Sequence, residues 1–515
     1  MTTGFMDAHE GIGTLPNIWT LECAWPTPTI SLTLFPTALF PNDTFLAYIS
    51  ISSGQGPTKT GPTKSGDSSG RAPVTTFDRI LPSIADILGT FFARLPALAP
   101  FLLKRDLNGR VRLIVPVSLR SNDASMALLR SVCHSMTSAL GPHAARENIL
   151  LHFEEDVGDV IGGAPVFPLE GVRVVDRLVT ETPWTAIAPE SSGTPRIVFF
   201  SITGGVGRST AVAVSALNLA QSGKRIPVLV LDLDLESRGL SGSLLPEDRR
   251  PEYGLADWLV EDLGDDGQTV FEGLTAASSF SRDGDIYVVP DHGRNPGEYV
   301  SKLGRVFMPK VSSDGTRTGW SERLSILIGQ LETRRKPDVI LLDSRAGFGE
   351  VASVCVTSLG ETLVLLFAVG GAPTWSGYRI LFDSWKRSGV TKEVRTKVQI
   401  VGAMVPDTGT KNFFERLREN GYDLFLPAYD EIPPGEAGDD LCTFEESDET
   451  APHCPWPILR DRGFSSLRSL HSRLESVDSR EVGLVFGPLL DGLNTALVKD
   501  PVQRTLGRTV GRNVG

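Results

Sequence analysis

The sequence predicts an α/β protein in which a doubly wound, mostly parallel sheet follows a smaller α/β domain. From residue 197 onward, short apolar runs typical of buried strands alternate with stretches of helical spacing. This is the order of a parallel sheet with helices on both faces. The first 180 residues show the same alternation over fewer elements. We therefore expect an N-terminal α/β recognition or regulatory domain over 1–185 and the larger domain over 186–515.

The composition is typical of a globular protein of two or three domains. Of the 515 residues, 41% are hydrophobic and 22% are charged, and one core rarely serves a chain of this length. A formal charge of −12 argues against broad adhesion to nucleic acid or anionic lipid. No run approaches the roughly 18 apolar residues of a membrane span, and the N-terminus lacks the layout of a secretion signal. We expect a cytoplasmic protein.

The five cysteines are few and scattered, which favours reduced thiols over a disulfide framework. Cys442, His453 and Cys454 lack the CxxC pair that usually anchors a zinc site, so we expect no zinc there. His134 lies beside Cys133 on a predicted helix. No orienting partner is visible, so a packed polar residue is the expectation rather than a catalytic base.

The N-terminal region contains a flexible linker and a short series of elements. Residues 52–73 are rich in Gly, Ser, Pro and Thr, which indicates a linker. Ser121 or Asn122 is placed to cap a helix. No chemical motif is found here. The predicted elements are strands at 29–35 and 45–51, a helix at 77–95, a strand at 111–119, a helix at 121–140 and a strand at 148–153.

A second linker, residues 189–196, precedes the informative part of the chain. Buried strands and helices follow in alternation, with a glycine-rich turn after the first strand. The predicted elements are strands at 197–202, 227–232, 286–289, 339–343, 362–368 and 398–404, with a helix at 210–221.

The glycine-rich turn is TGGVGRST, residues 203–210. A strand that ends in such a turn and leads into a helix points backbone N–H groups and the positive end of the helix dipole at one spot, where an anion binds. Gly204, Gly205 and Gly207 allow the backbone to approach phosphate oxygens, and the hydroxyl of Ser209 is placed as a ligand for Mg²⁺. A glycine turn alone can also serve packing.

Three carboxylates strengthen the case for a phosphate site. Asp232 and Asp234 lie at the end of the strand VLVLDLD, and Asp343 ends the strand DVILLD. Ligands of open α/β sheets bind at the carboxyl ends of the strands. These side chains are therefore expected to converge on the glycine turn.

Together, TGGVGRST, DLD and LLDSRAG resemble the ParA/MinD family of deviant Walker-A ATPases, specifically a variant subgroup with KGGVGR in place of KGGVGK. The resemblance covers about residues 195–500, with the motifs in the order and spacing of the family. It implies a P-loop NTPase domain that binds ATP and Mg²⁺, forms a nucleotide-dependent homodimer and hydrolyses ATP to control a partner protein.

The resemblance also implies roles for individual residues. Asp234 matches the switch I aspartate that positions the attacking water, Asp343 matches the Walker B aspartate, and residues 344–350 match switch II. The expected nucleotide contacts are Thr203, Gly204, Gly205, Val206, Gly207, Arg208, Ser209, Thr210 and Asp407; the expected metal site comprises Ser209, Asp232 and Asp343; and the expected catalytic residues are Arg208, Asp234 and Arg345.

Two departures from the family pattern concern cations. Thr203 stands in place of the signature lysine, and Arg208 replaces the P-loop lysine. A guanidinium is a planar fork, whereas an ammonium is a compact point charge. We therefore expect Arg208 to contact the β- and γ-phosphates with an altered geometry, and ATP hydrolysis to be slow. Arg345 and Arg238 are candidate arginine fingers, in cis or across a dimer. The alternative for both is a solvated or structurally paired arginine.

Several alternatives stay open. Asp407 follows the strand 398–404 where relatives often place asparagine, and an aspartate can suit guanine, so ATP over GTP rests on the resemblance. A non-hydrolysing scaffold is the alternative to a switched ATPase. DNA binding is a weaker expectation, because arginines on a helix more often form its solvent-exposed face. Membrane contact is also a weaker expectation, because the glycines of the C-terminal tail disfavour an amphipathic helix. The residues concerned are Arg460, Arg462, Arg468 and Arg473 for DNA, and 502–514 for membrane.

Overall fold

In the computed structural model, the chain consists of two compact units, 1–74 and 75–515. The structure describes residues 19–23, 29–36, 45–52, 75–161, 166–169, 172–180, 182–221, 225–237, 239–281, 285–431, 441–461, 463–464, 470–476 and 478–498. The predicted boundary at 185 stays a prediction. Most of the predicted linker, from 53 onward, lies outside the described residues.

The first unit contains an antiparallel sheet in the order β1-β2-β3. The strands are β1 (Trp19–Cys23), β2 (Thr29–Pro36) and β3 (Phe45–Ser52). The strands predicted at 29–35 and 45–51 are confirmed. They form a sheet of their own rather than joining the next one, and β1 was not predicted.

The described residues between 75 and 177 include a mixed five-stranded sheet in the order β6-β5-β4-β8-β7, with α1 and α2 packed on it through one apolar cluster. The cap predicted for α2 is confirmed at Asn122, whose side chain accepts a hydrogen bond from the backbone N–H of Ser125 at 3.0 Å. The elements are α1 (Phe77–Phe91), β4 (Leu102–Arg105), β5 (Val111–Pro116), α2 (Asp123–Leu140), α3 (Glu147–Leu150), β6 (Leu151–Glu154), β7 (Val166–Leu169) and β8 (Val172–Asp176).

Three details of this region differ from the predictions. The helix predicted to 95 tightens after residue 91 into a 3₁₀ helix, Phe92–Leu98, which contains Pro96. The strand predicted at 111–119 ends at Pro116, and the one predicted at 148–153 begins only at Leu151. Strands β4, β7 and β8 were not predicted because they are four or five residues long and lack a strong pattern.

One helical stretch of the described chain, Phe77–Leu98, is long and apolar enough to cross a membrane by length and composition alone. This differs from the expectation that no run approaches such a span. Its Ile80, Ile84 and Leu88 are buried in the cluster that packs on the five-stranded sheet. A single such helix is weak evidence for a membrane span.

The large sheet has the order β11-β12-β10-β15-β9-β16-β17-β18. All neighbouring pairs are parallel except β11 with β12. This confirms the doubly wound, mostly parallel sheet. Its strands are β9 (Arg196–Ser201), β10 (Val228–Asp232), β11 (Ala276–Ala277), β12 (Ile286–Val289), β15 (Val339–Asp343), β16 (Leu363–Ala368), β17 (Val398–Val405) and β18 (Trp456–Leu459).

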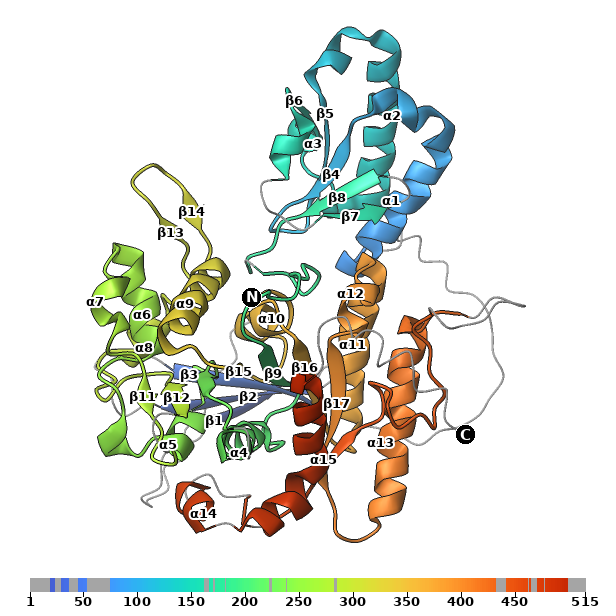
Figure 1. Ribbon diagram of the computed structural model, residues 1–515. Coiled ribbons are helices and arrows are strands. Elements are labelled where there is room, and N and C mark those ends of the chain that lie inside the picture. The colour runs from blue at the N-terminus through green and yellow to red at the C-terminus, as the bar shows by residue number, and fades with distance from the viewer. Residues whose placement is uncertain are drawn as a thin grey trace, which may run out of the picture. The chain divides into compact units, whose positions relative to one another are not determined.

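Helices cover both faces of this sheet (Figure 1). Along β9, Ile197 and Phe199 pack in one apolar cluster with α4 and α15, while Val198 and Phe200 pack in another with α9, α10 and α11. Burial on both faces explains why the strands are continuously apolar. The helices are α4 (Arg208–Gln221), α5 (Leu240–Leu244), α6 (Leu255–Glu261), α7 (Gly267–Phe271), α8 (Tyr299–Leu303), α9 (Trp320–Arg335), α10 (Glu350–Thr357), α11 (Ala372–Ser388), α12 (Thr391–Arg395), α13 (Thr410–Phe425), α14 (Leu470–Ser476) and α15 (Ser479–Val498).

A two-stranded hairpin, β13 (Lys310–Val311) and β14 (Arg317–Thr318), lies between α8 and α9. It belongs to neither larger sheet. The element that matters most for the site is the central strand β9, because its neighbour β15 and the next strand along the sheet, β10, end in aspartates predicted to face the glycine turn.

Candidate functional site

The turn between β9 and α4 has the geometry of a phosphate cradle. Gly205 and Gly207 have φ angles of +74° and +82°, in the left-handed region that favours glycine. Helix α4 begins at Arg208, two residues earlier than predicted. Its first backbone N–H groups have no partner within the helix and carry the positive end of its dipole. The turn is therefore suited to an anion.

This turn forms one wall of a cavity of about 520 Å³. The P-loop residues predicted from Gly204 to Thr210 all line it, together with Asp234 and Arg345. Thr203 does not: its hydroxyl shares a hydrogen bond of 3.2 Å with that of Thr374 in α11. The lining residues are Ser201, Gly204, Gly205, Val206, Gly207, Arg208, Ser209, Thr210, Asp234, Glu236, Ser237, Gly239, Arg345, Ala346, Met404 and Phe464.

Arg208 joins the ends of three strands. Its Nε donates to Asp343 Oδ1 at 2.7 Å, and its Nη2 donates to Asp234 Oδ2 at 2.7 Å. Its Nη1 donates to Ser201 Oγ at 3.3 Å. The guanidinium is buried, and the Ser237 hydroxyl also donates to Asp234 Oδ2, at 2.8 Å. The predicted role for Arg208 was at the phosphates; here it holds the two carboxylates instead.

Burial and charge work against each other in this cluster. Burial raises the pKa of Asp343, while Arg208 and the nearby Ser209 hydroxyl lower it. Burial also lowers the pKa of Arg208, but Asp343 and Asp234 outweigh it and leave that pKa above its ordinary value. Arg208 therefore stays cationic, and its charge is shared by two acids.

Asp232 is completely buried and does not line the cavity. Its Oδ2 accepts hydrogen bonds from the backbone N–H and the hydroxyl of Ser241, at 2.9 and 2.5 Å. Complete burial, followed by the charges of Asp291 and Asp343, raises the pKa of Asp232 well above its ordinary range. A carboxyl that resists ionisation is a poor ligand for Mg²⁺. The other oxygen, Oδ1, is buried and has no hydrogen-bond partner among the described residues, so the metal role of Asp232 stays a prediction.

Of the other two predicted metal ligands, Ser209 lines the cavity, whereas Asp343 is completely buried and does not line it. Oδ2 of Asp343 is buried and has no hydrogen-bond partner in the described part of the chain, and the Ser209 hydroxyl lies close enough to lower the pKa of the same carboxyl. Oxygen ligands of this kind suit Mg²⁺. Oδ1 of Asp343, in contrast, is already taken by Arg208.

Arg345 and Glu236 form an ion pair across the cavity mouth, from the two predicted switch segments. Both side chains are partly exposed, so the pair is open to competition by a ligand. The switch II segment is fixed to β9, since the N–H of Gly347 donates to the Ser201 carbonyl at 2.9 Å. The other candidate finger, Arg238, lies outside the described residues.

The structure adds two apolar side chains that the sequence analysis missed. Met404, the last residue but one of β17, has a φ of +57°, and its Cε would lie 3.5 Å from a Cβ built on Gly207. Phe464 contacts Phe486 edge to face at 5.1 Å and carries the guanidinium of Arg473 at 5.3 Å. Both line the cavity, whereas neither occurs in a motif.

Asp407, predicted to contact the base, is exposed and does not line the cavity. Its role stays a prediction, as do those of the other site residues. Of the four arginines considered for DNA, Arg462 and Arg468 lie outside the described residues, and so does the tail from 499. Arg473 pairs with Glu481.

The surroundings of the described cysteines and of His453 indicate packing rather than catalysis or metal binding. Cys133, Cys355, Cys442 and Cys454 are free thiols. Burial raises the pKa of Cys133 and Cys454 to about 11, which disfavours the reactive thiolate. His453 Nδ1 lies 2.6 Å from the Tyr429 hydroxyl. Within the described ranges, no group of three or more His, Cys, Asp or Glu side chains is placed to hold a metal ion.

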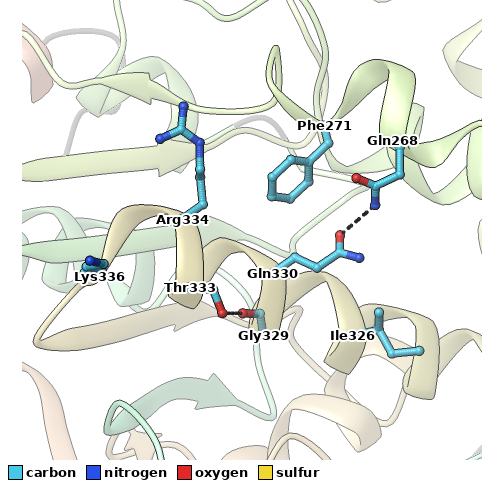
Figure 2. A pocket seen from close by; sticks show the side chains of 8 residues that line it. All are labelled: Gln268, Phe271, Ile326, Gly329, Gln330, Thr333, Arg334 and Lys336. Atoms are coloured by element: carbon cyan, nitrogen blue, oxygen red, sulfur yellow. Dashed lines mark hydrogen bonds between the residues drawn. The ribbon is translucent and has the colours of Figure 1, made fainter.

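A larger hollow of about 750 Å³ lies between α7 and α9 (Figure 2). Gln268 Nε2 donates to Gln330 Oε1 at 3.2 Å across it, and Arg334 turns away to pair with Glu272. It contains no carboxylate and no glycine cradle. The residues around it are Gln268, Phe271, Ile326, Gly329, Gln330, Thr333, Arg334 and Lys336. Its size alone indicates no function.

Neither a family model nor a curated protein matches the chain. Solved structures do. The cell division ATPase MinD of Pyrococcus furiosus is 20% identical over 58% of this chain and 98% of its own, with a TM-score of 0.36. The septum site-determining protein MinD of Pyrococcus horikoshii, complexed with Mg-ADP, is also 20% identical, over 58% and 96%, with a TM-score of 0.36.

A ParA family ATPase of Chlorobium tepidum is 16% identical over 60% of this chain and 100% of its own, with a TM-score of 0.38. These neighbours are ATPases of the ParA and MinD type, the family that the sequence motifs resemble.

Proposed function

We propose that this chain is a nucleotide-switched P-loop ATPase, which binds ATP in the cavity at the glycine turn and hydrolyses it slowly. One observation carries the proposal: a glycine turn with two left-handed glycines opens a cavity that also receives Asp234 and Arg345. Phosphate oxygens would be held by the backbone N–H groups from Gly204 to Thr210. The base would pack between Met404 and Phe464.

Each acidic group has a role in this scheme. Asp234 would orient the attacking water, once its bond to Arg208 loosens. Ser209 and Asp343 would hold Mg²⁺, which when bound supplies charge neutralisation at the β- and γ-phosphates. Hydrolysis is slow in this account because Arg208 holds both carboxylates at 2.7 Å.

The γ-phosphate would control the mouth of the cavity. Glu236 and Arg345 come from the two switch segments, and their exposed ion pair is easily replaced by a bond from Arg345 to phosphate. Loops ordered by a γ-phosphate relax when it leaves. We propose that this change gates a homodimer that engages a partner protein in the cytoplasm.

Oligomeric state tests the proposal. Sedimentation velocity of the full chain is expected to show dimer with ATP and monomer with ADP or without nucleotide. Asp234→Ala is expected to keep the ATP dimer, because hydrolysis is blocked, while the exposed aspartate of α13, in Asp423→Ala, serves as the matched control. A single species under all three conditions contradicts the switch.

The second candidate is a non-hydrolysing scaffold in which the nucleotide is structural. The pairing of Arg208 with both carboxylates favours it, since Arg208 occupies one oxygen of each acid. Measuring binding and turnover separately distinguishes the two. Binding without turnover, unchanged by Asp234→Ala, supports the scaffold.

A further inference from the structure

A connecting segment, residues 182–191, precedes β9 and is attached to the helix that follows the predicted switch II. At the start of α10, the N–H of Thr182 donates to Glu350 Oε1 at 3.2 Å. At the end of the same helix, the N–H of Ala188 donates to the Thr357 carbonyl at 2.6 Å. The connecting segment is therefore bonded to both ends of α10.

Trp184 of the connecting segment contacts switch II directly. Its ring lies edge to face with that of Phe348, with the centroids 5.8 Å apart, and it is tilted against the ring of Phe200 in β9 at 5.7 Å. Its carbonyl accepts a hydrogen bond from Trp385 Nε1 in α11 at 2.7 Å. Phe348, in contrast, is 46% exposed. Trp184 is thus held by the sheet and a helix, while its partner belongs to a segment expected to move.

The same switch segment reaches the nucleotide cavity through Arg345, three residues before Phe348. Between them, the N–H of Gly347 donates to the Ser201 carbonyl at 2.9 Å, and Gly347 has a φ of +87°. Glycine adopts such angles without strain, so the loop can turn about this fixed point. A phosphate that draws Arg345 into the cavity would therefore move Phe348 relative to Trp184.

We propose that Trp184 is a positioning residue for switch II, through which the nucleotide state of the cavity reaches the connecting segment and the N-terminal α/β region before it. This inference rests on the proposed function and identifies where its signal leaves the nucleotide site. The link is reciprocal: a partner that holds the connecting segment in one state changes the affinity for ATP by the same factor.

Hydrogen–deuterium exchange of the full chain tests the proposal, without nucleotide and with a non-hydrolysable ATP analogue and Mg²⁺. In wild type, the analogue is expected to speed amide exchange in 182–186 by about 3-fold or more, because moving Phe348 removes its contact with the segment. Residues 187–192 should not change. Their N–H groups at Ala188 and Ser191 donate to carbonyls at the far end of α10 and beyond it.

Three variants locate the contact. Trp184→Ala is expected to lose the response to the analogue, and Trp184→Phe to keep it, since an aromatic ring still faces Phe348. Trp456→Ala is the matched control and should also keep it. Trp456 is likewise a partly buried tryptophan, but it packs on α15 and does not line the cavity.

A fluorescent form of the analogue measures binding in parallel. Binding by wild type without a change in 182–186 overturns this inference and leaves the proposed function standing. A response of Trp184→Ala equal to that of wild type also overturns it. No binding overturns both. If Trp184→Ala does not fold, the wild-type comparison still decides.

Discussion

The two ends of strand β9 each hold a buried arginine, and the comparison separates structure from function. Arg196, at the amino end, and Arg208, just beyond the carboxyl end, are both 7% exposed. Arg196 donates to the Leu359 carbonyl at 2.6 Å and pairs with Glu332 at 3.2 Å. Arg208 pairs with two aspartates at 2.7 Å each.

The two ends differ in whether the acid paired with the arginine is accessible to a ligand. Glu332 is occupied by the N–H of Thr194, so the amino end is a structural tie between α9 and β9. Asp234 lines a cavity beside a glycine turn, so the carboxyl end presents paired charges to a ligand. Burial and pairing of an arginine therefore do not indicate a function; the cavity beside them does.

The largest expected effect is on stability. Arg208→Ala leaves Asp234 and Asp343 buried without their cation, which should lower the free energy of unfolding by about 3–5 kcal/mol. Arg196→Ala should cost less, because Glu332 is partly exposed and keeps its bond to Thr194. Urea unfolding of both variants measures the difference. Equal losses would contradict the distinction between the two ends.

Near the amino end of β9 lies a buried glutamate, Glu361, whose ionisation makes the stability of the fold depend on pH. Burial raises the pKa of Glu361 to about 7, against 4.5 for an ordinary glutamate. The folded protein therefore binds this proton more tightly than the unfolded chain does, and stability falls as pH rises from 4.5 through 7. The loss should total about 3 kcal/mol relative to Glu361→Gln, which lacks the titrating proton.

Unfolding of wild type and Glu361→Gln by urea between pH 4.5 and 8 checks this effect. If the free energy of unfolding depends on pH in the same way in the two proteins, the pKa of Glu361 is not raised. Asp232 and Asp343 also have raised pKa values and remain in both proteins, so their contribution cancels.

At the carboxyl end, Arg345 is expected to act on hydrolysis. Removing a finger that meets the γ-phosphate should slow single-turnover hydrolysis by about 100-fold or more, with ATP affinity changed only a few-fold. Arg334→Ala is the control, because Arg334 is a similarly exposed arginine paired with Glu272 outside the cavity. A rate for Arg345→Ala equal to that of wild type would assign Arg345 a structural role with Glu236.

The smallest expected effect concerns the base. Phe464→Ala removes an aromatic face from the cavity and should weaken nucleotide binding about 10-fold, the size of one stacking contact. Phe280→Ala is the control, because Phe280 contacts His471 at 4.7 Å and does not line the cavity. Affinity for inorganic triphosphate should be the same in both variants; if it falls with Phe464→Ala, the residue supports the loop rather than the base.

Local pattern predicted much of the fold. The central strands are continuously apolar and end in turn residues, so six of the eight described strands of the large sheet were predicted in order, whereas the short edge strands β11 and β18 were not. The short strands β4, β7 and β8 were not, because four or five residues carry little periodicity. Strand β6 was placed three residues too early, because one helical turn precedes it.

Only those parts of the candidate site whose residues lie close together in the sequence could be predicted. The pairing of Arg208 with Asp343 spans 135 residues, and Phe464 lies more than 250 residues beyond the turn it faces. No spacing rule connects such residues. Asp232 shows a different limit: its position at a strand end predicts a metal ligand, and no pattern in the sequence indicates that Ser241, nine residues later, occupies its Oδ2.

The most direct test of the account is ATP binding to two matched glycine variants. Gly205 and Gly389 are both exposed, both have a φ of +74°, and a Cβ added to either meets open space. Gly205→Asp places a negative charge in the proposed phosphate cradle, whereas Gly389→Asp places it at the end of α11. Titration should show Gly205→Asp weakened about 100-fold and Gly389→Asp equal to wild type. Equal affinity of the two variants would contradict nucleotide binding at this turn.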